Sequence, residues 1–379
     1  ADKIEGRVVP VDRAQHFNYT LREPVGVCTF IVPWNSPLML TGWKLAPALA
    51  AGCTAVIKPS EFTSASLLEF MRLVVEEADL PPGVVNVVTG YGSIVGEPLV
   101  THPKVAKVAF TGGTTTGARV NELAAKSFKK VSLELGGKSP NIVFDDCFMD
   151  DAVSGAISGI FAATGQTCIA GSRLLVQESI HDTFVEKLVA MARQARLGDP
   201  SKSDTQVGPV TTPPQYQKVL GYIDIAKNEG AKCVLGGGPA GKEEGGGKYF
   251  VKLTIFTGVD NKMRIAQEEV FGPVLSVIKF KDDDDAVRIA NDIAYGLGAG
   301  VWTQSVKRAH TMASRIKAGT VWINTYRAVS FLMPFGGYKA SGLGRENGAE
   351  AIEGYLQTKS VWINNGPGGG NPFIMKTAS

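Results

Sequence analysis

Cys168 is the residue whose type and surroundings first suggest chemistry. It stands in the stretch GIFAATGQTCIAGSRLL, where an apolar helix of small residues gives way to a glycine-containing loop and then to the apolar strand 174–176. A thiol attached to a rigid element and not obviously buried can act as a nucleophile. An isolated cysteine is more often a packed core residue. The stretches that gather around Cys168 therefore decide between these two interpretations.

Glycine-rich and polar stretches follow several predicted strands, at the edge where open α/β sheets bind ligands. Four of them are PWN (33–35), KPSE (58–61), FTGGTTTG (110–117) and ELGGKSP (134–140). Two more are EEVFGPV (268–274) and PFGGYKASGLGRE (334–346). Glu134 is costly to bury in the apolar strand VSLELGG, so a raised pKa and a functional role are plausible. A strand-end carboxylate that faces solvent is the open alternative.

Composition excludes several classes of function. The net charge of +3 over 379 residues shows no basic stripe, which argues against nucleic acid as a partner. No apolar run is long enough to span a bilayer, so no membrane partner is expected. The five cysteines lack CxxC spacing, which indicates a reducing, cytoplasmic location. The scattered histidines predict no metal site, and the acidic run 282–285 is better explained as capping of a helix over 286–291.

Short apolar strands alternate with amphipathic helices along most of the chain. This pattern predicts an α/β fold with parallel sheets and helices on their faces. One βα series ends near residue 136, and a second begins near residue 139. Residues 4–31 and the tail 359–365 carry a β pattern that belongs to neither core.

The order and spacing of the six stretches around GQTC resemble the NAD(P)-dependent aldehyde dehydrogenase superfamily, from about residue 3 to about residue 375. The resemblance implies two Rossmann-like parallel-sheet α/β lobes plus oligomerisation β segments. It divides the chain as follows: oligomerisation strands 1–22, NAD-binding domain 23–136, catalytic domain 137–340, a return to the NAD-binding domain 341–358, and a C-terminal oligomerisation strand and tail 359–379. A homodimer or homotetramer is expected.

The catalytic roles follow from this resemblance, residue by residue. Cys168 matches the nucleophile that attacks an aldehyde, passes a hydride to the nicotinamide and is left as a thioester. Asn35 matches the oxyanion donor, although alone it would be interpreted as a turn residue. Glu134 matches the base that activates the hydrolytic water, so release to water rather than to coenzyme A is expected. Glu346 matches a second carboxylate sometimes assigned to proton relay.

The resemblance also places NAD in a site that has no GxGxxG pattern. Lys58 and Glu61 match residues that hold the adenosine ribose, where a carboxylate repels a 2′-phosphate and favours NAD over NADP. Gly112 and Gly113 lead into a helix whose N-terminus can face the pyrophosphate. Glu269 and Phe271 match the pair that grips the nicotinamide ribose and ring. The other expected cofactor-binding residues are Pro33, Trp34, Ser60, Gly92, Gly96, Thr111 and Leu135.

The substrate is predicted to be a medium apolar or aromatic aldehyde. The residues expected to line the tunnel are Ser36, Leu40, Trp43, Ile169, Val329, Phe331 and Phe335. Ser36 replaces a frequent bulky aromatic, which would widen the tunnel. Arg327 lies nearby in NTYRAVSFLMPFGG, so a substrate that carries a carboxylate is an open alternative.

One departure from the resemblance is large. The family carries a substantial segment before the part that matches ADKIEGRVVP, so either that segment was left off this sequence or the chain is a fragment with an exposed core. A truncated, non-catalytic NAD-binding protein is therefore an alternative function, and acyl transfer to coenzyme A is a minor one. The joint presence of Cys168, Glu134 and Asn35 argues for an active, hydrolytic enzyme.

Overall fold

Five strands from residues 27–134 and one short strand from residues 342–343 pair as a six-stranded sheet in the order β16-β6-β5-β2-β3-β4. The structure is a computed structural model that describes residues 4–368 and 373. All neighbours in this sheet are parallel except β16 on β6. Its strands are β2 (Val27–Ile31), β3 (Thr54–Lys58), β4 (Val85–Val87), β5 (Val105–Thr111), β6 (Lys130–Glu134) and β16 (Gly342–Leu343). Its helices are α1 (Pro37–Ala50), α2 (Ser64–Glu77), the π-helix η1 (Gly92–Gly96), α3 (Glu97–Thr101) and α4 (Thr114–Ala125).

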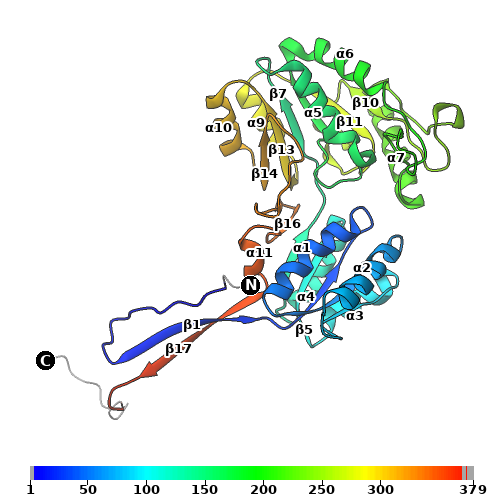
Figure 1. Ribbon diagram of the computed structural model, residues 1–379. Helices are drawn as coiled ribbons and strands as arrows, with labels where there is room; N and C mark the ends of the chain where they lie inside the picture. Colours follow the sequence, from blue (N-terminus) through cyan, green and yellow to red (C-terminus); the bar gives the residue numbers. More distant parts are fainter. Residues whose placement is uncertain (1–3, 369–372, 374–379) are drawn as a thin grey trace.

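A second sheet of seven strands forms the other lobe, in the order β14-β13-β7-β8-β11-β10-β9 (Figure 1). Only β9 runs antiparallel to its neighbour. The strands are β7 (Pro140–Val143), β8 (Arg173–Gln177), β9 (Lys232–Leu235), β10 (Thr254–Thr257), β11 (Val274–Phe280), β13 (Gly298–Trp302) and β14 (Thr320–Ile323). The helices are α5 (Met149–Phe161), α6 (His181–Ala192), α7 (Pro213–Asn228), α8 (Arg264–Gln267), α9 (Asp283–Asn291) and α10 (Val306–Arg315), with 3₁₀ turns η2 (Ala162–Gly165), η3 (Glu178–Ile180) and η4 (Lys242–Glu244).

A two-stranded ribbon extends from the six-stranded lobe (Figure 1). In it β1 (His16–Pro24) pairs antiparallel with β17 (Leu356–Asn364). Within the predicted β pattern of residues 4–31, the prediction of a strand over IEGRVVPV (4–11) is wrong, because this segment makes only an isolated bridge, between Val8 and Tyr19. An alternating pattern forms a strand only where a neighbouring strand can take up its backbone hydrogen bonds. The predicted tail beyond residue 368 lies outside the described residues apart from 373.

Two local features of the seven-stranded lobe bear on the sequence analysis. The helix α10 was not predicted, because most of its residues are polar and only Met312 among them is fully buried, so it lacks the apolar content that marks a core helix. The acidic run behaves as expected: the Asp282 carboxylate accepts a hydrogen bond from the Asp285 N–H, 2.9 Å away, and so caps α9.

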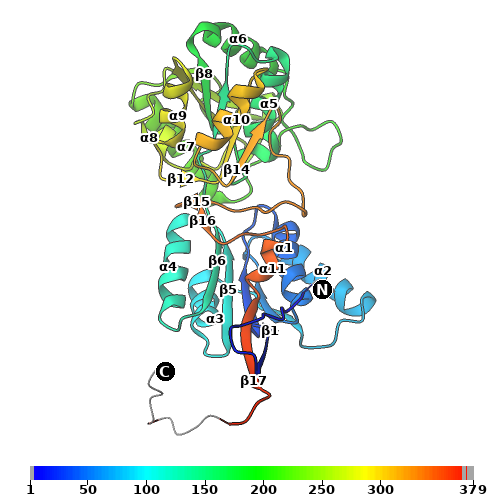
Figure 2. The same cartoon turned by 90° about the vertical axis from the view of Figure 1, so that its left-hand side faces the viewer.

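The chain crosses between the lobes twice, and these crossings bring the two sheets edge to edge (Figure 2). The first crossing follows Glu134 at the end of β6, and the return runs through β15 (Tyr338–Lys339), which pairs with β12 (Tyr295–Gly296), into β16. The short helix α11 (Glu350–Glu353) then precedes the ribbon. The carboxyl ends of β2, β5 and β6 therefore face the amino ends of β7, β8 and β11. None of the helices within 4–368 has the length and apolar character needed to cross a membrane.

Candidate active site

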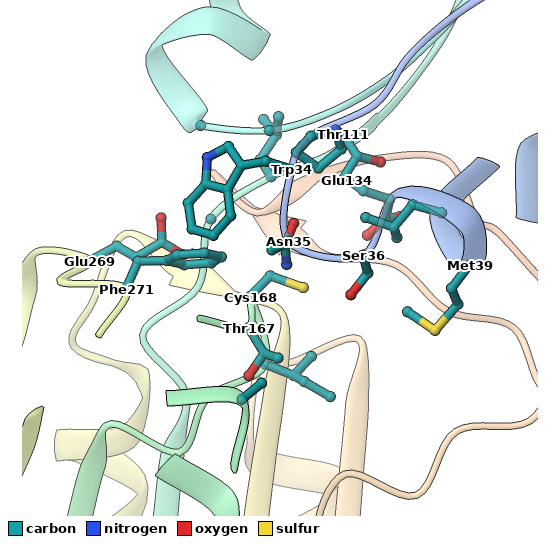
Figure 3. A pocket seen from close by; sticks show the side chains of 18 of the residues that line it. Trp34, Asn35, Ser36, Met39, Thr111, Glu134, Thr167, Cys168, Glu269 and Phe271 are labelled. Atoms are coloured by element: carbon teal, nitrogen blue, oxygen red, sulfur yellow. The ribbon is translucent and has the colours of Figure 1, made fainter. Parts of the chain in front are cut away.

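A cavity of about 460 Å³ lies between the two sheet edges. The six-stranded lobe contributes the segments that follow β2, β5 and β6, and the seven-stranded lobe contributes the segments that precede β8 and β11. Figure 3 shows Asn35 and Cys168 next to each other, with Glu269 and Phe271 on one side and Ser36 and Met39 on the other. The seven-stranded sheet thus faces the cavity with the amino-terminal ends of its strands. Open α/β sheets usually bind ligands at the carboxyl-terminal ends, so this side of the cavity was not predicted.

The backbone around Cys168 is held in a specific conformation. After α5 the chain turns through Ala163, Thr164 and Gly165, all in the left-handed region with φ of +52°, +56° and +71°. Gly137 has no side chain, and a Cβ there would come within 2.4 Å of the Cys168 carbonyl oxygen. Left-handed non-glycine residues cost free energy and persist only where surrounding packing fixes them. The thiol is therefore presented to the cavity by a rigid turn.

Burial, together with the nearby Glu134 and Glu269 carboxylates, raises the pKa of the Cys168 thiol to about 12. A thiol with this pKa is almost entirely protonated at neutral pH, whereas the thiolate is the nucleophile. Cys168 therefore has to lose its proton during the reaction rather than rest as a thiolate.

This raised pKa predicts a pH dependence for the modification of Cys168 by iodoacetamide. Because only the thiolate reacts and its fraction grows with pH below the pKa, the rate should rise about tenfold per pH unit from pH 7 to pH 10. An unshifted thiol would level off near its ordinary pKa of 9.0. The measurement is mass spectrometry of the Cys168 peptide in the cofactor-free protein. A plateau below pH 9 would contradict the proposed environment.

Glu134 ends strand β6 and is 4% exposed. Neither of its carboxylate oxygens has a hydrogen-bond partner within the described part of the chain. Burial raises its pKa well above the ordinary value, and the Glu346 carboxylate adds to the shift. An unpartnered buried carboxylate on the wall of a cavity is free to hydrogen-bond and deprotonate a water molecule. The solvent-facing alternative for Glu134 is wrong.

Glu346 lies behind the cavity wall rather than on it. It forms a buried ion pair with Lys44 of α1, and Lys44 Nζ also donates a hydrogen bond to Thr111 Oγ1 at 2.6 Å. The second Glu346 carboxylate oxygen has no partner among residues 4–368. Glu346 therefore acts on Glu134 through its charge.

Glu269 and Phe271 stand before β11 on the other wall. Glu269 Oε1 accepts a hydrogen bond from the Gly137 N–H at 2.9 Å, and a Cβ at Gly136 would come within 2.8 Å of Glu269 Oε2. The side chain of Gln215 donates to the Phe271 carbonyl at 2.9 Å and so supports the left-handed backbone of Phe271. This arrangement fixes a carboxylate and an aromatic ring at the rim of the cavity.

The segment after β5 provides an open helix end. Gly113 is the N-cap of α4, no side chain caps that helix, and a Cβ at Gly113 would meet nothing within 4 Å. Lys58 and Glu61 lie further along the sheet edge, where Lys58 Nζ is 3.4 Å from Glu61 Oε2. The strand order β5-β2-β3-β4 therefore lines up Gly113, Lys58 and η1 along one edge.

The cavity brings together most of the residues predicted to form the site. Those on its wall are Cys168, Glu134, Asn35, Pro33, Trp34, Thr111, Gly112, Gly113, Leu135, Glu269, Phe271, Ser36, Leu40, Trp43, Ile169, Val329 and Phe335. Those outside it are Lys58, Ser60, Glu61, Gly92, Gly96 and Phe331. Phe331 is 77% exposed, because its loop stands in solvent.

The structure adds lining residues that the sequence analysis did not single out. Among them are Met39, Thr167, Gln215 and Lys218, and Arg327 joins them on the wall. Gln215 and Lys218 are three residues apart and so share one face of α7, but no neighbouring motif marks that face. Met39 is one turn before Trp43 in α1, which is the signal that could have identified it.

Comparisons with known proteins agree with this architecture. The family model described as "Aldehyde dehydrogenase family" matches residues 1–361. The putative aldehyde dehydrogenase DhaS of Bacillus subtilis is 47% identical over 362 residues, which cover 96% of this chain and 72% of DhaS. Aldehyde dehydrogenase 1A1 of Oryctolagus cuniculus is 48% identical over 364 residues, with the same coverage of both chains.

Solved structures show the same fold. PnpE from Pseudomonas sp. WBC-3 superposes with a TM-score of 0.94 at 49% identity, covering 98% of this chain and 76% of PnpE. Betaine aldehyde dehydrogenase from Staphylococcus aureus, solved in complex with NAD+, superposes with a TM-score of 0.95 at 41% identity, covering 99% of this chain and 74% of that one. The family model and these relatives together show that the chain belongs to the aldehyde dehydrogenase family.

Proposed function

We propose that this protein oxidises an aldehyde to the carboxylic acid with NAD, through a thioester on Cys168 that water releases. The observation that carries the proposal is a single cavity that holds a thiol, an unpartnered buried carboxylate and an amide donor, from Cys168, Glu134 and Asn35. A nucleophile, a base and an oxyanion donor are the groups that acyl transfer through a covalent intermediate requires.

In the first half of the reaction, the Cys168 thiol gives its proton to a water molecule, and the resulting thiolate attacks the aldehyde carbon and forms a thiohemiacetal. One Asn35 N–H is held by the Gln166 carbonyl at 3.1 Å, which leaves the second N–H for the developing oxyanion. The backbone N–H of Cys168 is the other donor. Fixed donors of this kind stabilise the transition state by roughly 3 kcal/mol each.

In the second half, Glu134 takes a proton from a water molecule that attacks the thioester, and Cys168 leaves as the thiolate. The raised pKa of Glu134 makes it a stronger base than an exposed carboxylate, because proton uptake relieves an unpartnered buried charge. The product is the carboxylic acid. This assignment places hydrolysis, rather than transfer to coenzyme A, at the end of the cycle.

The residues present fit NAD. The uncapped N-terminus of α4 with open space at Gly113 suits a pyrophosphate, and Glu269 is held at the rim where it would bind the nicotinamide ribose. Pro33, Trp34, Thr111 and Leu135 would line the nicotinamide end, while Lys58, Ser60, Glu61, Gly92 and Gly96 would hold the adenosine end. When bound, NAD accepts the hydride that leaves the thiohemiacetal.

Glu61 is expected to set the preference for NAD over NADP. Its carboxylate is about one-third exposed and would face the 2′ position of the adenosine ribose, where it repels a phosphate. Glu61→Gln should raise the ratio of kcat/KM for NADP to that for NAD about tenfold, since one removed repulsion of about 1.4 kcal/mol corresponds to that factor. Glu77→Gln, an exposed change on α2, is the matched control. An unchanged ratio in Glu61→Gln would remove Glu61 from the cofactor site.

The ribbon of β1 and β17 is proposed to pair with a second copy of this chain. It exposes Phe17, Leu21, Trp362 and Ile363, and no strand within the described residues pairs with the outer edge of β17. Unpaired edges with apolar side chains favour association, and a symmetric homo-oligomer, dimer or tetramer, covers them. The division into an NAD-binding domain, a catalytic domain and oligomerisation strands is part of the same proposal, as is a cytoplasmic location.

The test of the proposed function is aldehyde-dependent formation of NADH by the purified protein. A panel of aldehydes that varies in chain length, aromatic character and charge is expected to show turnover, with preference for aldehydes that have a medium apolar or aromatic body. Product analysis should find the free acid, and added coenzyme A should not accelerate release. NAD binding without turnover of any aldehyde would instead support a non-catalytic NAD-binding protein.

A further inference from the structure

We propose that Arg327 binds a carboxylate of the substrate, so that the preferred aldehydes carry an acidic group at the end remote from the reacting carbonyl. This inference rests on the proposed function and names the substrate class of the same site. It starts from the observation that Arg327 lines the cavity that contains Cys168, while the other substrate-side residues are mostly apolar.

The backbone at Arg327 is strained and held on both sides. Its φ of +63° lies in the left-handed region, which a residue with a long side chain rarely adopts. Before it, the Tyr326 hydroxyl donates to the Ile169 carbonyl at 3.0 Å, and after it Trp322 Nε1 donates to the Ala328 carbonyl at 2.8 Å. Because Ile169 follows the nucleophile directly, this arrangement fixes Arg327 relative to Cys168.

The guanidinium of Arg327 is poorly satisfied by the protein. Nη1 donates to the Ser158 carbonyl at 3.2 Å, and no carboxylate forms an ion pair with Arg327 within the described ranges. By contrast, Arg308 in the same lobe pairs with both Asp146 and Asp283. A guanidinium has five N–H donors, so most of those on Arg327 remain available. A half-buried cation without a counter-charge is costly unless a ligand supplies the charge.

The charges around the cavity determine where a carboxylate could lie. Glu134 and Glu269 stand near Cys168 and raise its pKa, so a substrate carboxylate near the thiol would be repelled. Lys218 is the other cation on the wall, but it comes from α7 beside Gln215 and Glu269, on the wall assigned to the nicotinamide. Arg327 is the cation left for the substrate end.

The apolar wall fits the body of such a substrate. Leu40, Trp43, Val329 and Phe335 line the substrate end together with Met39. Trp43 and Phe335 are in contact, with ring centroids 5.1 Å apart. An aldehyde with an apolar or aromatic body and a terminal carboxylate would pack on these side chains and form a charge-assisted, two-point hydrogen bond with Arg327.

A matched pair of substrates tests the inference: 4-carboxybenzaldehyde and its methyl ester, which differ in charge but not in the reacting group. For the unmodified protein we expect kcat/KM for the carboxylate to exceed that for the ester by at least about 30-fold, chiefly through KM. Arg327→Gln should bring this ratio close to 1. Arg327→Lys should leave an intermediate ratio, because lysine keeps the positive charge but cannot donate two parallel hydrogen bonds to one carboxylate. Arg193→Gln, an exposed charge change directly after α6, should leave the ratio unchanged.

The outcomes separate this inference from the proposed function. The role of Arg327 is overturned if the carboxylate-to-ester ratio of kcat/KM is near 1 in the unmodified protein, or if this ratio is unchanged in Arg327→Gln. Oxidation of both aldehydes would still uphold the proposed function in either case. If neither aldehyde is oxidised, binding is measured by whether 4-methylbenzoate, which has a carboxylate at one end only, slows iodoacetamide modification of Cys168. Protection that is lost in Arg327→Gln supports the carboxylate site, and equal protection in both proteins, or none, overturns it.

Discussion

Cys168→Ala should abolish aldehyde-dependent NADH formation, with a loss of at least about 10⁴-fold, on the scale that follows removal of a covalent nucleophile. The reason is that no thiohemiacetal and no thioester can form without the sulfur. Alanine is smaller and apolar, and the turn around residue 168 is fixed by its backbone and by Gly137 rather than by the thiol. The fold and the affinity for NAD should therefore be retained.

Cys147→Ala is the matched control for this result. Cys147 is also a free, half-buried cysteine of the seven-stranded lobe, but it does not line the cavity. NADH absorbance after addition of aldehyde measures turnover, and calorimetric titration with NAD measures binding. Residual activity of Cys168→Ala within tenfold of the unmodified protein would show that Cys168 is not the nucleophile.

Glu134→Gln is expected to separate the two halves of the reaction. The first turnover should proceed, because the thiol can still attack and the hydride can still leave. Hydrolysis should then stall, so steady-state turnover falls about 10²–10⁴-fold, the usual contribution of a general base. Stopped-flow measurement should show a burst of NADH close to one equivalent per active site, and mass spectrometry should find the acyl group on Cys168.

Hydroxylamine provides the control for Glu134→Gln. Hydroxylamine is added after the NADH burst and after removal of free aldehyde, with which it would form an oxime. It attacks a thioester without a general base, so it should release the acyl group of Glu134→Gln as a hydroxamic acid, whereas Cys168→Ala carries no acyl group to release. Equal loss of the burst and of the steady state would instead place Glu134 in the first half of the reaction. Faster steady-state turnover of the unmodified protein on addition of coenzyme A would favour acyl transfer over hydrolysis.

The local sequence patterns were sufficient to predict the strands and the loops that form the site. The alternation of apolar strands and amphipathic helices predicted parallel sheets, and the strands before Asn35, Gly112 and Gly136 appear where the pattern placed them. The spacing of the motifs around Cys168 identified the family that the comparisons show. Turn chemistry, strand propensity and motif spacing are local properties, so they can be recognised in a single sequence.

Burial and charge at the site were decided by the tertiary structure. The sequence left Glu134 open between a solvent-facing and a buried carboxylate, and the structure buries it without a partner because β16 pairs with β6 and the second lobe closes over the strand end. The pairing of Glu346 with Lys44 joins residues about 300 positions apart, which no local pattern can indicate. The raised pKa of Cys168 depends on its burial and on the Glu134 and Glu269 carboxylates, which come from distant parts of the chain.

The sequence by itself determined which side chains this protein has for its chemistry: a thiol, a carboxylate in an apolar strand, and glycines where backbones must approach closely. Only the tertiary structure decided that the carboxyl-terminal strand ends of one sheet face the amino-terminal strand ends of the other. It also decided that Arg327 joins Cys168 on the wall of the resulting cavity. The physical reason is that residue type and short-range spacing are written in the chain. The distance between two side chains, and the water excluded between them, depend on how whole sheets pack.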